Sequence, residues 1–532
     1  MTERFFLEGI ALGPLAPSLK GLNMKTLVSL IGSAGIIIGA AMVCFLSSDG
    51  SVLAEELRIG SSRQLFLDDE WLLDSLDNVQ IRVHRPVRKE IIDIRNRPWE
   101  GSGSKFHIVL FDPQTKRYQM YYTAWAAENI RPFSVHNMNV AYLESLDGIR
   151  WNYRPLRIQE WEGSLENNLI LKGAISFAPC IDPRPNVPAE QRYKGITDRG
   201  NGAIAWFSSD GIHWTVQNDN KPVYTTQTPN AFDSQTVVFW SEKERQFVLY
   251  YRARDPGNYR SAERAVSKDF IHWTNEGMIQ LREDERPRAN RGEYYTNQVQ
   301  PYYRAPEFYI GFPARYNDNG ITESFQKLPE QEERAIRMKS NPRFGTVTSD
   351  SIYIVSHDGI HFRTSNDVFL APGLRTKNNW GYGDNYLAAG VVETQSPNDD
   401  EGRELSLYAT ESAFTAYDLI CRRYSLRIDG FASLHAATKP GTVVTLPICF
   451  EGKELSLNVA TSGFGTLQVE ICRPDGTPLP GFTKSDCDVI YGDSLDYRVS
   501  WKGSRDVSAL SNQPIVLKFY LQETDIYSLK FE

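Results

Sequence analysis

The sequence lacks most of the short motifs by which the common enzyme classes are identified. It has no CxxC pair, no glycine-rich loop that would hold a phosphate and no Gly-x-Ser-x-Gly motif. Its 8 histidines are scattered along 532 residues, so no metal-binding cluster is expected. These absences argue against a nucleotide-binding protein, a serine hydrolase with that motif and a zinc enzyme. No cofactor is expected, although a structural Ca²⁺ site stays open.

Basic charge and helical periodicity are also scarce. The formal net charge of -8 provides no basic face for nucleic acid and no attraction to an anionic membrane surface. No apolar pattern with helical spacing persists beyond the N-terminal region. Aromatic residues, by contrast, make up 12% of the chain, and they favour β-strands and sugar-binding surfaces.

Cysteine is rare, and its count beyond the N-terminal region is odd. The residues concerned are Cys180, Cys421, Cys449, Cys472 and Cys487. An odd count without regular spacing favours buried thiols over a disulfide framework. The last three fall in one C-terminal segment, so a single bridge among them stays open.

The N-terminal region has the pattern of an export signal. Lys25 precedes an apolar run over 27–46, and small or aliphatic residues over 51–54 provide a cleavage-like site. Residues 1–54 are therefore predicted to be a signal peptide, with Met24 as an alternative start, or an uncleaved transmembrane anchor. In both cases the protein is predicted to be exported, periplasmic or extracellular, and to contact the membrane only through this segment.

One pattern, Ser-x-Asp-Gly-Ile-x-Trp, recurs along the chain. Two copies span 145–151 and 208–214. In the copy at 267–273 Phe replaces Gly, in the one at 356–362 Phe replaces Trp, and a worn fifth copy lies at 426–431. Asp-Gly is a tight-turn dipeptide, because glycine adopts positive φ at little cost. Each copy is therefore predicted to be a hairpin turn followed by an aromatic plug.

The repeat predicts the fold. The plugs Trp151, Trp214 and Trp273 are expected to be largely buried between neighbouring sheets. Aromatic strands precede the copies, and another strand and turn precede each of those. Units of about four strands at blade-like spacing predict an all-β fold, with a five-bladed β-propeller over 63–434. Longer alternating strands predict a C-terminal β-sandwich over 441–532.

Several stretches resemble one protein family. They are Leu65-Phe66-Leu67-Asp68-Asp69, Arg97-Pro98-Trp99-Glu100-Gly101, Phe177-Ala178-Pro179-Cys180-Ile181-Asp182, Ala231-Phe232-Asp233-Ser234-Gln235 and Trp501-Lys502-Gly503. Together they resemble exported bacterial proteins described as glycosyl hydrolase family 32-like, which are related to the invertase and arabinanase types. The resemblance implies a five-bladed propeller with a C-terminal β-sandwich, and a carbohydrate substrate.

The chain departs from the invertase type at its signature motifs. That type carries Asn-Asp-Pro-Asn on its first blade and Glu-Cys on its third, and neither is present in the corresponding place. Arg254-Asp255-Pro256 is similar, but it follows a strand that is expected in mid-blade. The resemblance therefore assigns no catalytic residue.

Candidate catalytic residues follow instead from the geometry of a propeller. The first strand of each blade lines the central channel, so polar groups at the starts of these strands converge at one mouth. Glycoside hydrolysis needs a protonated acid and a base or nucleophile around the sugar. Glu100 is predicted as base or nucleophile, Asp182 as the group that orients the sugar or stabilises charge, and Asp233 as the acid.

Other polar and aromatic residues are predicted to bind the substrate. Arginine suits hydroxyl, sulfate or carboxylate groups, and tryptophan stacks on sugar faces. The predicted binding residues are Trp99, Arg252, Arg254, Asn297, Gln300, Arg315 and Asp384, with Trp125 and Trp380 as further stacking candidates.

These residues predict a secreted glycoside hydrolase with paired carboxylates in the central pocket. The alternative is a noncatalytic glycan-binding or surface-interaction propeller, since fold alone does not confer activity. A weaker alternative is a sialidase, which would need an arginine cluster and a tyrosine nucleophile at the mouth. For Asp182, a plain turn before Pro183 stays open as well.

Overall fold

A computed structural model of the protein describes residues 56–66, 71–101, 103–125, 138–174, 176–282, 293–396, 402–415 and 417–532. The predicted signal peptide or anchor over 1–54 lies outside these residues, as do Asp68 and Asp69. Within the described ranges, no helix combines the length and the apolar character that crossing a bilayer requires.

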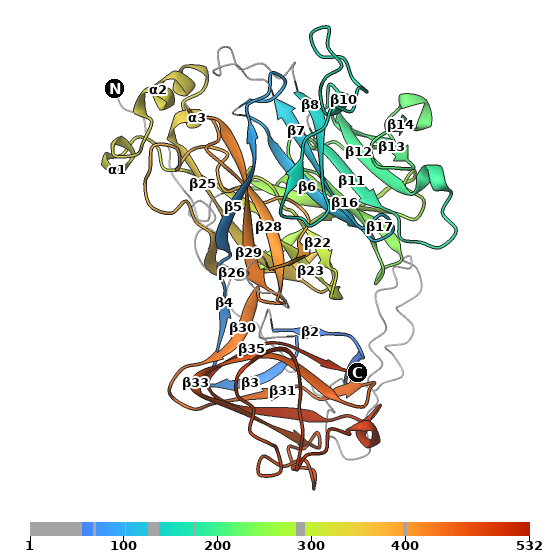
Figure 1. Ribbon diagram of the computed structural model, residues 1–532, viewed down its shortest axis with the longest axis vertical. Coiled ribbons are helices and arrows are strands. Elements are labelled where there is room, and N and C mark those ends of the chain that lie inside the picture. The colour runs from blue at the N-terminus through green and yellow to red at the C-terminus, as the bar shows by residue number, and fades with distance from the viewer. Residues whose placement is uncertain are drawn as a thin grey trace, which may run out of the picture. The chain divides into compact units, whose positions relative to one another are not determined.

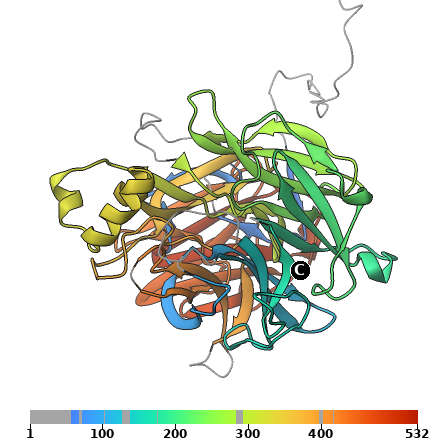
Figure 2. The same cartoon turned by 90° about the horizontal axis from the view of Figure 1, so that it is seen from above.

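The described chain is all-β, and most of its strands form small sheets in a propeller-like arrangement (Figures 1 and 2). Sheet I contains β6 (Lys105–Asp112), β7 (Arg117–Trp125), β8 (Met138–Ser145), β9 (Trp151–Asn152) and β10 (Leu169–Lys172). Sheet II contains β11 (Phe177–Ile181), β12 (Tyr193–Arg199), β13 (Gly202–Ser208), β14 (Thr215–Val216) and β15 (Tyr224–Thr225). Sheet III contains β16 (Val237–Ser241), β17 (Gln246–Arg254), β18 (Arg260–Ser267) and β19 (Thr274–Met278).

Two more sheets follow in the chain. Sheet IV contains β20 (Gln280–Arg282), β21 (Glu293–Tyr294), β22 (Gln300–Tyr302), β23 (Ala305–Gly311), β24 (Ala314–Asp318), β25 (Val347–Ser356) and β26 (His361–Leu370). Sheet V contains β27 (Val392–Gln395), β28 (Arg403–Glu411), β29 (Leu419–Arg427) and β5 (Val87–Arg95). Since β5 precedes sheet I in the chain and pairs with β29, sheet V joins the two ends of the propeller-like part.

Three short helices interrupt sheet IV between β24 and β25. They are α1 (Glu323–Gln326), α2 (Gln331–Ser340) and α3 (Arg343–Thr346). Thr322 begins α1 by accepting a hydrogen bond from the Phe325 backbone N–H, as an N-cap does. Arg334 of α2 is buried and donates to the carbonyl of Gly345 in α3 at 2.8 Å, which holds these two helices together.

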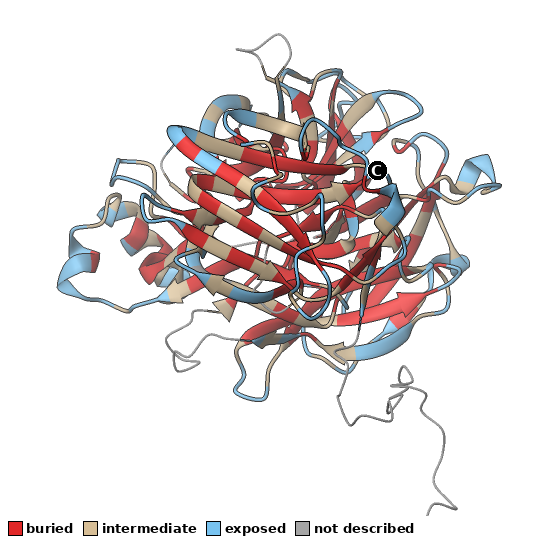
Figure 3. Cartoon of the chain, turned by 90° about the horizontal axis from the view of Figure 1, so that it is seen from below, coloured by how far each residue is buried: buried red, intermediate tan, exposed pale blue. Residues whose placement is uncertain are grey.

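An eight-stranded sheet gathers the C-terminal strands and some N-terminal ones. It contains β2 (Gln64–Leu65), β3 (Leu73–Asp77), β4 (Gln80–Val83), β30 (Ala432–Ala436), β31 (Gly441–Thr445), β33 (Leu455–Cys472), β34 (Asp493–Arg498) and β35 (Val516–Phe531). Beside it, β1 (Leu57–Gly60) pairs with β32 (Ile448–Phe450) in parallel. Apolar side chains of these strands form one buried core, and exposed residues gather in the turns (Figure 3). All five described cysteines are buried free thiols.

The fifth, worn copy of the repeat joins sheet IV to the C-terminal sheet. The fully buried Asp429 accepts hydrogen bonds from the Tyr302 hydroxyl at 2.7 Å and from the Ser528 hydroxyl at 2.8 Å. Its carboxylate also lies 3.3 Å from the Arg63 guanidinium and 2.9 Å from that of Arg304. This buried charge is therefore paired on both sides of the junction, as burial of a carboxylate requires.

The repeated turns have a common construction. In the second copy, Asp210 Oδ1 accepts backbone N–H bonds from Ile212 and His213, each at 2.8 Å, and Ser208 Oγ bonds to the same oxygen. The predicted burial of the plugs is corrected, because Trp151, Trp214 and Trp273 are only half-buried. The physical reason is that the indole N–H closes the turn: Trp214 donates to the Gly211 carbonyl at 3.0 Å, which holds the ring at the sheet edge.

Candidate active site

Glu100, predicted as base or nucleophile, is held in a buried charge cluster before β6. Its carboxylate accepts hydrogen bonds from the Arg97 guanidinium, at 2.9 and 3.0 Å, and from the Tyr122 hydroxyl. The Arg95 guanidinium lies 3.9 Å away and stacks over the Tyr122 ring. With no exposed side-chain surface and charged partners on two sides, Glu100 has the contacts of a structural residue.

Glu100 lies before the beginning of β6, the first strand of sheet I. Asp182 directly follows β11, the first strand of sheet II, and therefore lies at the opposite end of these strands. Its buried carboxylate is 2.7 Å from Arg184 Nη2 and 3.1 Å from Lys194 Nζ. Asp112 is the last residue of β6, at the corresponding end of sheet I, and the Tyr193 hydroxyl of sheet II donates to it at 2.6 Å. Asp182 and Glu100 therefore do not lie together. The contacts of Asp182 are those expected for a plain turn before Pro183.

Asp233 and Arg252 are brought together. Asp233 precedes β16, and 57% of its side chain is exposed. The guanidinium of Arg252, in the neighbouring β17, donates to the carboxylate at 3.0 Å and to the carbonyl of Asn230 at 2.8 Å. Arg252 is itself buried, so it fixes a carboxylate that solvent or a ligand can reach.

The other predicted binding residues each have separate partners. Trp99 is buried and donates to Asn168 Oδ1 at 2.8 Å, and Arg254 donates to the Asn258 carbonyl at 2.8 Å. Arg315 makes two bonds of 2.7 Å to Asp350. Asn297 accepts from the backbone N–H of Val299 at 3.2 Å, Gln300 lines a pocket at the far end of the strands, and Trp380 donates to the Gly373 carbonyl at 3.0 Å.

Asp384 precedes β27 of sheet V and holds a turn in place. Its buried carboxyl accepts backbone N–H bonds from Gly381 at 2.9 Å and Ala413 at 2.7 Å. Burial raises the pKa of this carboxyl to about 7, although these two bonds act in the opposite direction. Because the turn contains Tyr382, Asp384 is a positioning residue for that ring.

A lysine that the sequence analysis did not consider begins the first strand of sheet I. Lys105 is 7% exposed, and its ammonium nitrogen lies near four aromatic rings. The distances to the ring centroids are 4.9 Å for Phe106, 5.2 Å for Trp125, 5.7 Å for Tyr382 and 5.5 Å for Phe414. No described residue accepts a hydrogen bond from this ammonium or offers it a carboxylate, so cation–π attraction compensates for part of its lost hydration.

The backbone around Lys105 is shaped for this arrangement. The register of β6 against β7 shifts between Lys105 and Ile108, and Phe106 has a φ of 58°, which is rare for an aromatic residue. A Cβ atom at Gly103 would lie 2.4 Å from the Trp125 ring, so only glycine fits there. Strained backbone of this kind is concentrated at functional sites.

Tyr295 lies between β21 and β22 of sheet IV, within reach of the charge of the same lysine. The Tyr382 hydroxyl donates to the Tyr295 hydroxyl at 2.9 Å. Burial alone would raise the pKa of the Tyr295 phenol, as does the charge of Asp233. The Lys105 ammonium, the Tyr382 hydrogen bond and the Arg252 guanidinium outweigh both, so the pKa of this phenol is lowered from its usual value. We call Lys105, Asp233, Arg252, Tyr295 and Tyr382 the Tyr295 cluster.

Asp233 was predicted because polar groups near the starts of the first strands of a propeller converge at one mouth. The same reasoning applies to Lys105 and Tyr295. Lys105 begins β6, Asp233 lies shortly before β16 and Tyr295 lies between β21 and β22, so all three are close to the region where polar groups were expected to converge. They were missed because only carboxyl and amide groups were considered at these positions. Among the described residues, no group of three or more His, Cys, Asp or Glu side chains is placed to hold a metal ion.

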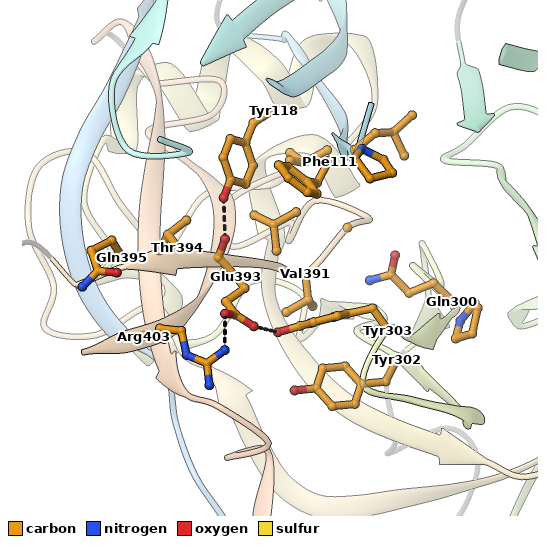
Figure 4. Close-up of a pocket in the computed structure, with 16 residues that line it drawn as sticks. Phe111, Tyr118, Gln300, Tyr302, Tyr303, Val391, Glu393, Thr394, Gln395 and Arg403 are labelled. Atoms are coloured by element: carbon orange, nitrogen blue, oxygen red, sulfur yellow. Dashed lines mark hydrogen bonds and ion pairs between the residues drawn. The ribbon is translucent and has the colours of Figure 1, made fainter. Parts of the chain in front are cut away.

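A pocket of about 580 Å³ lies at the other end of the first strands (Figure 4). Aromatic side chains line it, among them Phe111, Tyr118 and Tyr303, together with Gln300. The carboxylate of Glu393, which also lines the pocket, accepts hydrogen bonds from the Tyr303 hydroxyl at 2.6 Å and from the Arg403 guanidinium at 2.9 Å. Since Lys105 and Phe111 are six residues apart on one strand, about 20 Å separates this pocket from the Tyr295 cluster.

Comparisons with known proteins give distant similarities. No family model matches the chain. A levanbiose-producing levanase of Bacillus subtilis is 36% identical over 62 residues, which cover 11% of this chain and 12% of the levanase. The chain thus spans about an eighth of the length of the curated relative it matches.

Solved structures of glycoside hydrolases are similar over more of the chain. An arabinoxylan arabinofuranohydrolase of family 43 from Bacillus subtilis is 11% identical, covering 84% of this chain and 99% of its own, with a TM-score of 0.39. A β-fructofuranosidase from Schwanniomyces occidentalis is 12% identical, covering 83% and 97%, with a TM-score of 0.38. Because these similarities are weak, the function is inferred below from the side chains of the site.

Proposed function

We propose that the protein is an exported glycoside hydrolase, built as a five-bladed propeller with a C-terminal β-sandwich, that cleaves a glycosidic bond at the Tyr295 cluster. Sheets I to V would be the blades. One observation carries the proposal: the segment with Asp233 contacts the segment with Tyr295, since the Ser234 hydroxyl donates to the Tyr295 backbone carbonyl at 2.6 Å, and the charge of Asp233 acts on the Tyr295 phenol. Two titratable groups in contrasting environments are what acid–base catalysis of hydrolysis requires.

The contacts suggest the role of each group. Asp233 is exposed and is held by Arg252, so water can reach its carboxylate, which suits a general base. The Tyr295 phenol, whose pKa is lowered beside Lys105, suits a general acid. Asp233 would therefore be the base rather than the acid expected from blade order, and a phenol would replace the second carboxyl.

The proposed reaction is a direct displacement by water. Asp233 removes a proton from the water as the water oxygen bonds to the anomeric carbon. The bond from that carbon to the leaving oxygen breaks, and the leaving oxygen takes the proton of Tyr295. Lys105 then stabilises the tyrosinate. Because water attacks from the face opposite the leaving group, the configuration at the anomeric carbon is inverted.

Turnover on a panel of poly- and oligosaccharides tests the proposal. On whichever substrate is cleaved, Tyr295→Phe and Asp233→Asn should each lower kcat by about 10²–10⁴-fold, the usual contribution of one acid or base. Asp233→Asn should leave the melting temperature nearly unchanged, whereas Tyr295→Phe should lower it modestly, because the buried Tyr382 hydroxyl loses its acceptor. Tyr303→Phe, in the distant pocket, is the matched control and should retain wild-type turnover. Wild-type turnover by Tyr295→Phe would refute the assignment of this site.

Noncatalytic glycan binding is the second candidate, and the pocket in Figure 4 favours it. Aromatic walls with a few fixed polar groups suit a sugar face, and Tyr303 is half-exposed there. If no glycan of the panel is cleaved but one binds, Tyr303→Ala should abolish that binding while Tyr295→Phe leaves it intact. The reverse pattern would place binding at the Tyr295 cluster.

A further inference from the structure

Arginine residues from sheet III surround the tyrosine rings of the site. Arg260 lies 5.3 Å from the ring centroid of Tyr295, and its guanidinium bonds to Glu293 at 2.6 Å. Arg252 is likewise paired, with Asp233. These two carboxylates are therefore already used by neighbouring arginines.

Three further cations nearby have no carboxylate partner among the described residues. They are Lys105, Arg254 and Arg343. Burial and the like charge of Arg260 lower the pKa of Arg254, although the Glu293 carboxylate acts in the opposite direction, and Glu293 is already bonded to Arg260. Arg343 stands near the ring of Tyr316, and its buried Nε atom has no hydrogen-bond partner. In a chain with a formal charge of -8, this is a local excess of positive charge.

Hydroxyl groups at the same place are also unsatisfied. The Tyr316 and Tyr386 hydroxyls are buried and have no hydrogen-bond partner within the described residues. Both rings pack against Tyr295, with centroid distances of 6.0 and 5.5 Å. Buried donors without partners are rare in native proteins, because each loses its hydration without compensation. Beside cations without carboxylate partners, these two hydroxyls are able to donate to a bound anion.

We propose that the Tyr295 cluster and the cations around it bind an anionic substituent of the sugar, a carboxylate or a sulfate. The inference rests on the proposed function and adds to it the substrate class: acidic rather than neutral glycans. The Lys105 ammonium has three N–H donors, and the aromatic rings offer them no lone-pair acceptor. An anion would supply both acceptor and charge, whereas a neutral hydroxyl leaves the excess charge in place.

Binding of three matched disaccharides tests the inference. The probes are digalacturonate, galactobiose with a 6-sulfate group, and neutral galactobiose, each titrated calorimetrically into the full chain. At least one anionic probe should bind about tenfold or more tightly than the neutral one, since a hydrogen bond to a charged group is stronger than a neutral one. The comparison of the two anionic probes tells a carboxylate site from a sulfate site.

Two variants identify the residues responsible. Lys105→Met keeps the side-chain length, removes the charge and should reduce the preference for the anionic probe to about twofold or less. Arg254→Gln changes a partly exposed side chain and should also reduce the preference for the anionic probe. This second variant keeps the test informative if Lys105→Met does not fold. Lys268→Gln removes an exposed charge of sheet III and is the matched control, which should keep the preference.

The outcomes separate this inference from the proposed function. Equal binding of all three probes, or an undiminished preference in both Lys105→Met and Arg254→Gln, would overturn the inference even if neutral glycans are hydrolysed. Preferential binding of the acidic probe without turnover of any acidic glycan would support the inference and count against the hydrolase.

Discussion

The hydroxyl of Tyr408 donates a hydrogen bond of 2.5 Å to the carbonyl of Gly148, 260 positions earlier in the chain. This bond joins β28 of sheet V to the Asp-Gly turn of sheet I. The same contact recurs from Tyr121 of sheet I to Gly211 of sheet II, at 2.9 Å. Each Asp-Gly turn is therefore also a connection to the neighbouring sheet.

Loss of one such connection should destabilise the fold modestly. Tyr408→Phe removes the donor, but the Gly148 carbonyl keeps its bond from the Trp151 indole at 3.1 Å. The free energy of unfolding should therefore fall by about 1 kcal/mol, the net value of one hydrogen bond. Urea denaturation measures this change, and Tyr491→Phe, at an exposed ring, is the control. No difference between the two variants would show that the connection contributes nothing to stability.

Phe270, which stands at the glycine position of the third copy, should contribute more to stability than one such hydrogen bond. A Cβ at Gly211 would lie 2.6 Å from the Tyr121 hydroxyl, whereas no tyrosine hydroxyl among the described residues is bonded to the Phe270 carbonyl, which accepts from the Trp273 indole at 2.9 Å. The fully buried ring of Phe270 packs there instead, against Phe207 and Phe247. Phe270→Ala should therefore lower the free energy of unfolding by about 3–5 kcal/mol.

The comparison with a half-buried plug tests that explanation. Trp214→Ala removes a larger side chain that is less buried, so it should be less destabilising than Phe270→Ala. Chemical denaturation of both variants measures the order. A larger loss for Trp214→Ala would show that the indole, and not the ring at the glycine position, supports the contact between sheets.

Much of the fold could be predicted from the repeat, because its turn and strand signals are local. The all-β, propeller-like arrangement and the Ser-Asp turns at Asp147 and Asp210 follow from such signals. Burial of Trp214 was overestimated, since the sequence does not show that its indole closes its own turn. Asp182 was placed at the wrong end of a strand, because local sequence does not separate a strand's beginning from its end when turns flank both.

The activity of Lys105→Met should have an altered pH profile. If Tyr295 is the acid, activity is present while the phenol is protonated and is lost as pH rises through its lowered pKa. Removal of the Lys105 charge takes away the largest influence that lowers this pKa, so the alkaline limb of kcat should move to higher pH. A profile of kcat between about pH 6 and 11 measures the shift. An unmoved limb would show that Tyr295 does not donate the proton.

Asp182 and Asp233 should respond in opposite ways to the same change. Asp182→Asn leaves the ammonium of Lys194, which is only 2% exposed, without its carboxylate partner at 3.1 Å. Loss of one partner of a buried ion pair costs about 3 kcal/mol or more, so the melting temperature should fall. Arg184 is partly exposed and can be hydrated, which limits the loss.

Asp233→Asn changes an exposed side chain, and the buried Arg252 guanidinium keeps its bond to the Asn230 carbonyl and can donate to the new amide oxygen, so the melting temperature should stay near that of the wild type while turnover falls. Turnover of Asp182→Asn, measured at a temperature where it is folded, should be within a few-fold of the wild type. Thermal unfolding and kcat measured for both variants give the full comparison. If Asp182→Asn abolishes turnover without loss of stability, the reaction takes place at the other end of the first strands, beside the pocket in Figure 4, and the assignment to the Tyr295 cluster is wrong.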